Sequence, residues 1–180
     1  MTTVEIAAIA QLSEQAKPLL AEEMGPSRFV RLLESKHFYR DAIHFLAHGL
    51  PIDMAIRWGA ACSRELLAPE QLELDRECLA AIDSWLTSRD DPSRWRARDV
   101  AERSGLRSAP DLIAMAVFFS GGSLTPAGAP AADPPPYVAN KMVGSAIQLA
   151  VFSQLPEKTE DRFRKTLEIS RQLAKLQPQG

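Results

Sequence analysis

Four side chains that can bind a metal or transfer a proton follow one another in the first half of the chain. His37, Asp41, His44 and His48 are four, three and four residues apart, a spacing that places them on one side of an α-helix. A histidine pair four residues apart can hold a divalent cation, and Asp41 could supply a third ligand. The stretch contains no His-Glu-x-x-His pattern. Asp41, His44 and His48 are therefore only candidate metal ligands, and we expect no metal or cofactor.

A second stretch with chemical potential is Ser120-Gly121-Gly122-Ser123. A phosphate-binding loop would need a Gly-Lys-Ser/Thr ending after a strand, and a nucleophile elbow would need Gly-x-Ser-x-Gly at a strand-to-helix turn. Neither pattern is present. Two glycines that follow an apolar segment are typical of a helix C-terminus. The sequence therefore predicts a protein that is not an enzyme.

The same glycines open a long segment that can continue no helix. Of the 16 residues from Gly121 to Pro136, three are Gly and five are Pro. A connection of this length is either a structural strap or a partner-binding loop. As partner-binding candidates we select the residues at its two ends, which are Ser120, Gly121, Gly122, Ser123, Pro134, Pro135 and Pro136.

Charged residues are concentrated in two neighbouring segments of opposite sign. Residues 70–83 contain five acids and one base, whereas residues 89–107 contain six arginines and four acids around Trp95. These two faces could pair with each other or offer complementary patches to a partner. Trp95 is the aromatic residue that we expect to be exposed as an anchor for a partner.

The composition excludes several functional classes. The 180 residues are 46% hydrophobic and carry a formal net charge of -2, which argues against both intrinsic disorder and a dedicated nucleic-acid binder. The longest apolar run, Leu112 to Phe119, is far shorter than a membrane span. The first residues lack the basic start of a secretory signal. We expect a cytoplasmic protein with no membrane insertion, in which Cys62 and Cys78 are reduced and buried.

The apolar spacing predicts an all-α fold. No segment shows the sustained alternation of a strand, whereas Pro51, Pro69, Pro92 and Pro110 each precede a stretch of helical periodicity. We expect residues 1–26 to be weakly ordered and residues 27–176 to form one compact bundle of about seven to nine antiparallel helices. The expected helices span residues 4–23, 27–34, 37–48, 52–67, 70–88, 93–104, 111–120, 136–154 and 159–176.

Two helix boundaries carry clear capping signals. Asp91 stands before Pro92 and is expected to cap the helix that this proline opens, and Gly105 is expected to end it in the left-handed conformation. Ser108 and Asp111 have the spacing of a capping box. These signals predict a sharp corner between the helices at 93–104 and 111–120.

Two of the expected helices should form the centre of the bundle. Residues 112–119 are apolar on every face, and residues 137–152 have only one narrow polar stripe. The Gly/Pro-rich loop that joins them must therefore run over the surface. The last helix has an apolar stripe that includes Phe163, Leu167 and Leu173. We expect this stripe to pack against the bundle, with homodimer formation as the alternative.

Several segments resemble an uncharacterised family of small helical bacterial proteins. They are Leu-Ala-His-Gly-Leu-Pro at 46–51, Ala-Ile-Arg-Trp at 55–58, Ala-Ala-Ile-Asp-Ser-Trp at 80–85, and Phe-Phe-Ser-Gly-Gly-Ser-Leu at 118–124 with the prolines that follow. The likeness covers approximately residues 28–152, and the family is associated with gene neighbourhoods of type VI secretion.

This resemblance implies a cellular context and no catalytic mechanism. It favours a non-enzymatic accessory or adaptor protein whose partner is another protein, either a secretion component or an effector. A second hypothesis is an immunity protein that neutralises an effector through the acidic segment at residues 70–83. The third is a metal-binding helical protein that uses the His44/His48 pair.

Overall fold

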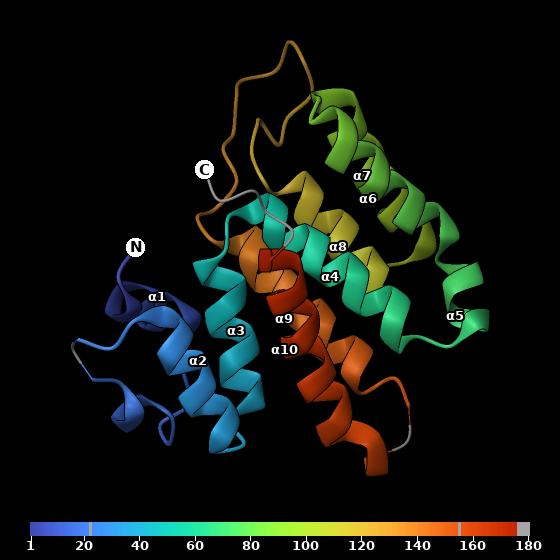
Figure 1. Cartoon of the computed structure of the whole chain (residues 1–180). Helices are drawn as coiled ribbons and strands as arrows, with labels where there is room; N and C mark the ends of the chain where they lie inside the picture. The colour runs from blue at the N-terminus through green and yellow to red at the C-terminus, as the bar shows by residue number, and fades with distance from the viewer. Residues whose placement is uncertain (22, 155, 176–180) are drawn as a thin grey trace.

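The computed structural model describes residues 1–21, 23–154 and 156–175, and within them every regular secondary-structure element is a helix (Figure 1). This confirms the predicted all-α class. In these described ranges, two short 3-10 turns, at Lys17–Leu19 and Pro156–Lys158, accompany ten α-helices. The helices are α1 (Thr3–Ala10), α2 (Pro26–Ser35), α3 (Tyr39–Gly49), α4 (Ile52–Leu66), α5 (Pro69–Leu74), α6 (Arg76–Ser88), α7 (Asp91–Ser104), α8 (Ala109–Phe118), α9 (Val138–Val151) and α10 (Thr159–Lys175).

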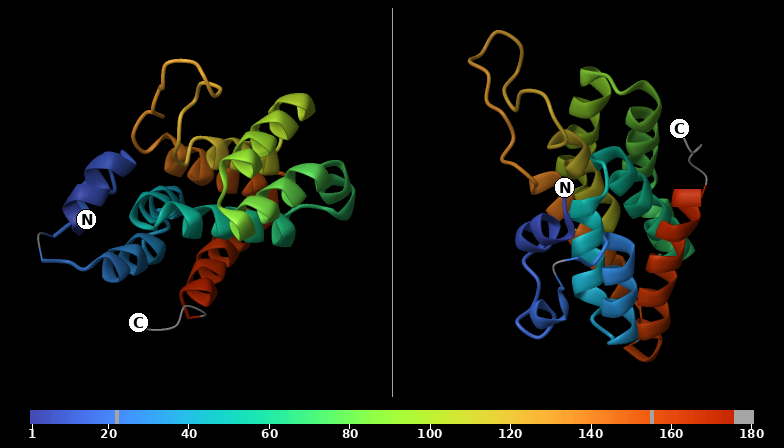
Figure 2. Two further views of the ribbon diagram at one scale, coloured as in Figure 1. Left: turned by 90° about the horizontal axis from the view of Figure 1, so that it is seen from above. Right: turned by 60° about the vertical axis from the view of Figure 1, so that its left-hand side comes forward.

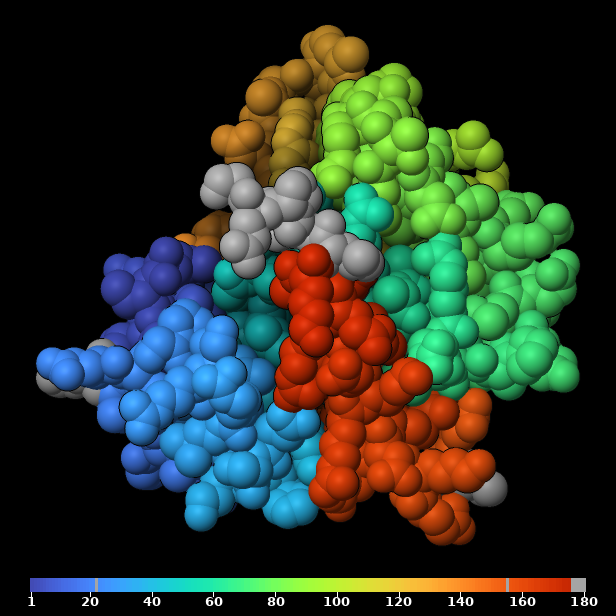
Figure 3. All heavy atoms as spheres, in the orientation of Figure 1, coloured from blue at the N-terminus to red at the C-terminus, as the bar shows by residue number. Residues whose placement is uncertain are grey.

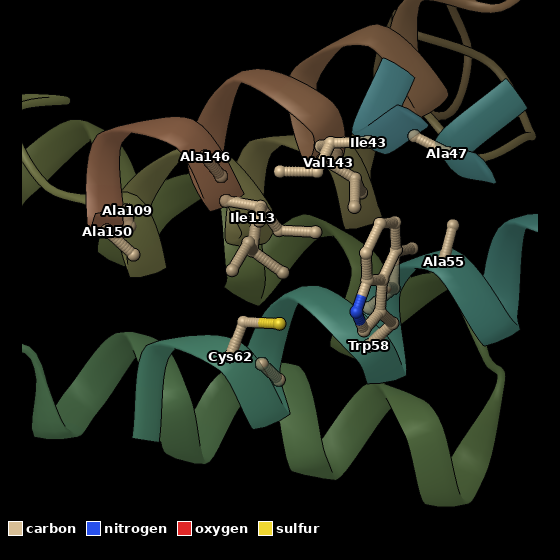
Figure 4. Close-up of a cluster of buried hydrophobic side chains, with 14 of the residues drawn as sticks. Ile43, Ala47, Ala55, Trp58, Cys62, Ala109, Ile113, Val143, Ala146 and Ala150 are labelled. Atoms are coloured by element: carbon tan, nitrogen blue, oxygen red, sulfur yellow. The ribbon is translucent and has the colours of Figure 1, made fainter. Parts of the chain in front are cut away.

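The centre of the bundle is the pair α8 and α9, as the sequence predicts. The two helices pack against each other, α7 lies against α8, and α4 lies against both. Figure 4 shows side chains from α3, α4, α8 and α9 gathered around Ile113. A Cβ at Gly59 would lie 3.2 Å from Ile113 and 3.3 Å from Val143, so this glycine allows α4 to approach both central helices. The outer side of α9 is open to solvent at Lys141 and Leu149.

Helix ends follow local rules where the sequence carries a clear signal. Ser108 and Asp111 form the predicted capping box of α8, and Gly105 ends α7 with a left-handed backbone (φ 92°). Asp90 caps α7 by accepting a bond from the Ser93 N–H (2.9 Å). The expectation that Asp91 would be this cap was wrong, because Asp91 is already the first helical residue.

The helix expected over residues 70–88 is two helices. Asp75 ends α5 and precedes α6, with φ -93° and ψ 8°. Leu74 beside it is 85% exposed, so the apolar pattern that suggested a continuous helix includes a residue that faces water. An Asp side chain offers the backbone alternatives to helical hydrogen bonding, which makes Asp75 a suitable position for the break.

The N-terminal segment packs on the bundle. Ile6 and Ala10 of α1, with Leu12 and Ala16 after it, are buried, and α1 lies against α3 (Figure 2). The chain after α1 is also held by a polar contact, described below. Residues 1–26 were expected to be weakly ordered because their apolar pattern is weak, and in this arrangement they contribute to the core through isolated side chains.

The last helix, α10, covers α4 through the stripe that the sequence predicts. Of the predicted stripe, Phe163 and Leu167 are buried and Leu173 is half-buried against the core. The Trp58 indole N–H also donates to the Thr166 carbonyl (2.8 Å). The stripe is therefore used for packing within the chain. Within the described part of the chain, every helix falls short of the length and apolar character that a bilayer span requires.

The segment between α8 and α9 leaves the bundle as an extended loop, as the sequence predicts (Figures 1 and 2). Residues 126–133 are all exposed. In the space-filling view the loop stands beside the upper end of α6 and α7 (Figure 3). Its two ends enter the bundle at different places, and each end borders a distinct group of polar side chains.

Candidate functional site

Arg94 of α7 anchors the first end of the loop. Its guanidinium donates to the Phe118 carbonyl (2.8 Å) and to the Ser123 carbonyl (2.7 Å), although the residue is only 4% exposed. Its Nε also donates to the Asp91 carboxylate (2.8 Å). Charge-assisted bonds are stronger than neutral ones. Arg94 therefore ties the end of α8 and the start of the loop to α7.

Gly122 lies directly against this anchor. Its backbone is left-handed (φ 70°), and a Cβ at this position would lie 3.1 Å from the Arg94 Nη2. Any other residue would therefore strain the backbone and press on the guanidinium. Ser120 is also local in its contacts, since its hydroxyl donates to the Val117 carbonyl (2.7 Å). These two candidates shape the loop end.

Trp95 packs beside the same loop end and is less exposed than we expected. It is half-buried, with its ring edge-on to Phe118 at 5.0 Å between centroids. The indole N–H donates to Asp91 (3.1 Å), and the Arg98 guanidinium lies 5.1 Å from the ring centre. One side of Trp95 therefore supports α8, and only the remainder is open to a partner.

The loop is organised by its own hydrogen bonds. The Leu124 N–H donates to the Ala132 carbonyl (2.8 Å), and the Thr125 hydroxyl donates to the Pro130 carbonyl (2.7 Å). The Ser123 hydroxyl accepts from the Ala132 N–H (3.2 Å) and also contacts the Thr125 hydroxyl. The three bonds to Pro130 and Ala132 join the first half of the loop to the second half, so the exposed tip is held in a defined conformation.

The second end of the loop borders a cleft of about 660 Å³ between α1, α3 and the start of α9. Pro135, Pro136 and Tyr137 line one side of it, and His44 and His48 line another. Tyr137 has a left-handed backbone (φ 61°), which turns the chain into α9. Two groups that lie far apart in the sequence, the prolines and the histidine pair, therefore meet here. Pro134 precedes this wall, half-buried.

The four-residue histidine face does not form as predicted. His37 lies before α3 with φ 62°, and its Nδ1 is 3.2 Å from Glu160 of α10. The Asp41 carboxylate accepts from the Ser13 N–H (2.6 Å) and hydroxyl (3.0 Å). Among the described residues there is no group of three or more His, Cys, Asp or Glu arranged to hold a metal ion.

His44 and His48 have different environments although both line the cleft. The Gln148 side-chain oxygen accepts from the Arg40 guanidinium (2.9 Å), so its amide N–H donates to the His44 Nε2 (2.5 Å). Burial lowers the pKa of His44. His48 is 4% exposed, and its Nδ1 is buried without a hydrogen-bond partner in the described part of the chain. Burial, with His44 and Lys141 adding to it, lowers the pKa of His48 to about 4.

Some acidic residues of the segment at 70–83 form ion pairs with arginines of neighbouring helices. Glu77 of α6 pairs with Arg103 of α7 (3.4 Å), and Asp83 pairs with Arg64 of α4 (2.7 Å). These are exposed pairs, which contribute little to stability. The acidic segment is therefore partly neutralised by the chain itself.

Sequence reasoning missed Arg94, Lys141 and Tyr137. Arg94 is one of the six arginines at residues 89–107 that were expected to form a charged face. It precedes Ala97 and Ala101 by three and seven residues, which places it on the buried face of α7. This spacing was a usable signal. Lys141 belongs to the narrow polar stripe of residues 137–152, but nothing local placed it or Tyr137 at a site. The cleft that they border is closed by α1 and α3, which are distant in sequence.

Comparison with known proteins places the chain in a family. Residues 29–174 match the model of DUF6931, a family of unknown function. The chain belongs to this family. The match runs from within α2 to within α10 and includes the loop and the α3 and α9 walls of the cleft. Searches of curated proteins and of solved structures gave no significant match.

Proposed function

We propose that this DUF6931 protein is a non-enzymatic interaction protein that binds a protein partner through the tip of the α8–α9 loop. The observation that carries the proposal is the combination of exposure and internal order. Residues 126–133 are exposed, while Leu124 and Thr125 bond across to Ala132 and Pro130. A loop that is already ordered loses less conformational entropy on binding than a disordered one.

The chemistry of the tip suits a protein surface. Its side chains are small, with Ala127, Ala129 and Ala131 between prolines, so a partner can approach the backbone closely. Trp95, half-buried at the first loop end, extends this surface with an aromatic ring. Aromatic residues with a packed side and an open side are common anchors of interfaces.

We infer a cytoplasmic adaptor or accessory role in type VI secretion as the context. Support for this context comes from the resemblance to the family of small helical bacterial proteins associated with type VI secretion. The segments at residues 46–51, 55–58, 80–85 and 118–124 carry this resemblance. The immunity role remains the alternative. The ion pairs that Glu77 and Asp83 make with Arg103 and Arg64 leave less unpaired negative charge for a basic effector, which makes the loop the stronger candidate surface.

The test is site-specific photo-crosslinking in the native cell. A benzophenone amino acid replaces Ala129 at the loop tip or, as a control, Ala80, which is exposed on α6. We expect one dominant crosslinked protein from position 129, a secretion component, and none of it from position 80. Ala129→Arg should abolish binding of that purified partner, whereas Ala80→Arg should not. Crosslinks that are identical at both positions, or absent while the secretion apparatus is expressed, would refute the proposal.

A further inference from the structure

The cleft between α1, α3 and α9 has an apolar part and a polar part. Ile9 and Ala10 of α1 face it together with Pro135 and Pro136 from the loop end. The polar part is formed by side chains of α3 and α9, described below. Its volume of about 660 Å³ lies within the range of small-molecule sites. A ligand that fits this shape would combine an apolar body with one polar head.

The polar part of the cleft favours negative charge. Lys141 lies in it, and the described residues that line the cleft include no Asp or Glu. The first turn of α9 also borders it through Val138. Tyr137 provides no side-chain cap for this turn, and the free N–H groups of a helix start attract anions.

His48 supplies an independent indication of a ligand. It lines the cleft and is 4% exposed, and its Nδ1 has no hydrogen-bond partner among the described residues. Buried polar atoms in proteins are nearly always bonded, because an unbonded one costs about 1–3 kcal/mol. Its neighbour His44, by contrast, is bonded to Gln148. Because this Nδ1 is closed to solvent, a polar group on a ligand would relieve the cost after a rotation of the His48 ring toward the cleft that it lines.

We propose that the cleft binds a small organic anion, with its acid group near Lys141, His48 and the start of α9 and its apolar part against Ile9 and the Pro135–Pro136 wall. This site is separate from the loop tip at residues 126–133. It therefore neither requires nor excludes the partner contact proposed above. Ligand binding here would connect the second end of the loop to α1 and α3.

Binding of an anion should be coupled to a proton on His48. The charged and titratable groups around it are Lys141 on α9, His44 on α3 and the Tyr137 ring, which lies edge-on to His48 at 6.2 Å between centroids. His44 is itself near Asp41 and Arg40. The α1 residues that line the cleft carry no charge. A bound acid group would favour the imidazolium, so the pKa of His48 should rise on binding, and affinity should increase as the pH falls from about 7.5 to about 5.5.

Titration of the full chain with benzoate, followed by calorimetry and by imidazole NMR, tests the site. Benzamide is the neutral probe of similar shape. We expect benzoate to bind with a dissociation constant of about 1 mM or tighter at about pH 5.5, to raise the pKa of His48, and to outcompete benzamide by about tenfold. Lys141→Gln should weaken benzoate binding by about tenfold. Lys165→Gln, which removes the same charge from α10, should leave binding unchanged.

Two results would overturn the proposal. Equal affinity for benzoate and benzamide would show an apolar cleft with no preference for charge. No heat and no change in the His48 resonances at about 10 mM benzoate, ten times the expected constant, would show that the cleft does not take this class of ligand. The crosslinking at Ala129 is unaffected by either result.

Discussion

Asp111 and His48 are both polar residues in the interior, but only one of them has its hydrogen-bonding capacity used. Asp111 is 1% exposed and its carboxylate accepts four hydrogen bonds, whereas His48 is 4% exposed and its Nδ1 accepts or donates none in the described part of the chain. The donors to Asp111 are the Ser104 hydroxyl, the Cys78 thiol, and the N–H groups of Arg107 and Ser108.

The difference separates a structural role from a candidate binding role. Asp111 links the end of α7, the start of α8 and a thiol of α6, and its place in a capping box is already visible in the sequence. Burial alone would raise the pKa of Asp111, but the hydrogen bonds from Ser104, Cys78 and the backbone outweigh burial and lower it. His48 has no such compensation, so its pKa falls to about 4. A buried polar group whose hydrogen bonds are all made stabilises the fold, whereas one without a partner can still form a hydrogen bond to a ligand.

The largest effect should come from Asp111→Ala. This change leaves four donors at the α7–α8 corner without their acceptor, and we expect a loss of about 4 kcal/mol in the free energy of unfolding. Urea denaturation measures it. The control is Asp83→Ala, which removes an exposed carboxylate paired with Arg64 and should cost less than about 1 kcal/mol. Equal losses of unfolding free energy in the two variants would mean that the hydrogen bonds of Asp111 do not stabilise the fold.

The next effect concerns the pH dependence of stability. The pKa of His48 is about 4 in the folded chain and 6.5 is its ordinary value, so the unfolded chain binds a proton first as the pH falls. The stability contributed by neutral His48 is complete above pH 6.5 and is lost as the pH falls toward 4, by about 3 kcal/mol in total. Urea denaturation between about pH 7.5 and pH 4 measures the decline.

The variant His48→Gln should flatten most of this decline, leaving the part due to His44, whose pKa is also lowered by burial. Asp111 acts in a different range. Because its pKa is lowered, its contribution is complete above its ordinary value of 3.8 and is lost only in stronger acid. A wild-type profile that stays level from pH 6.5 to about 4 would contradict the assignment of a neutral, buried His48.

The smallest effect should come from His48→Leu at about pH 7.5. An apolar side chain of similar size removes an unbonded polar atom, so stability should stay within about 1 kcal/mol of the wild type. The matched change Asp111→Leu should lose several times as much. Thermal unfolding monitored by circular dichroism compares the two. If His48→Leu lost as much unfolding free energy as Asp111→Leu, His48 would have to make stabilising hydrogen bonds in the folded chain, contrary to the difference drawn here between the two residues.

The sequence could predict features that depend on nearby residues. The capping box at Ser108 and Asp111, the end of α7 at Gly105 and the two buried central helices depend on spacing within one segment, and all were correct. The burial of Cys62 and Cys78 was also correct. In each case the residues that determine the feature lie within a few helical turns of one another in the sequence.

Features that depend on distant residues were missed. The acceptors of Arg94 lie 24 and 29 residues further along the chain, so its buried role was hidden among other arginines. His37 followed the spacing of His44 and His48, but its contacts with Tyr39 and Glu160 hold it outside the helix. The cleft required the packing of α1 on α3, which the weak apolar pattern of residues 1–26 did not reveal.

The anchoring of the α8–α9 loop has a practical consequence. Its first end is fixed by Arg94 and its second by the turn at Tyr137, while Gly128 at the tip has φ 91° and open space around it, with no heavy atom within 4 Å of where a Cβ would stand. Lengthening a loop costs only about 0.6 kcal/mol for each doubling of its length. A fluorescent or affinity peptide inserted after Gly128 should therefore project into solvent and leave the helical bundle intact. The loop tip is thus a suitable position for displaying peptides on this protein.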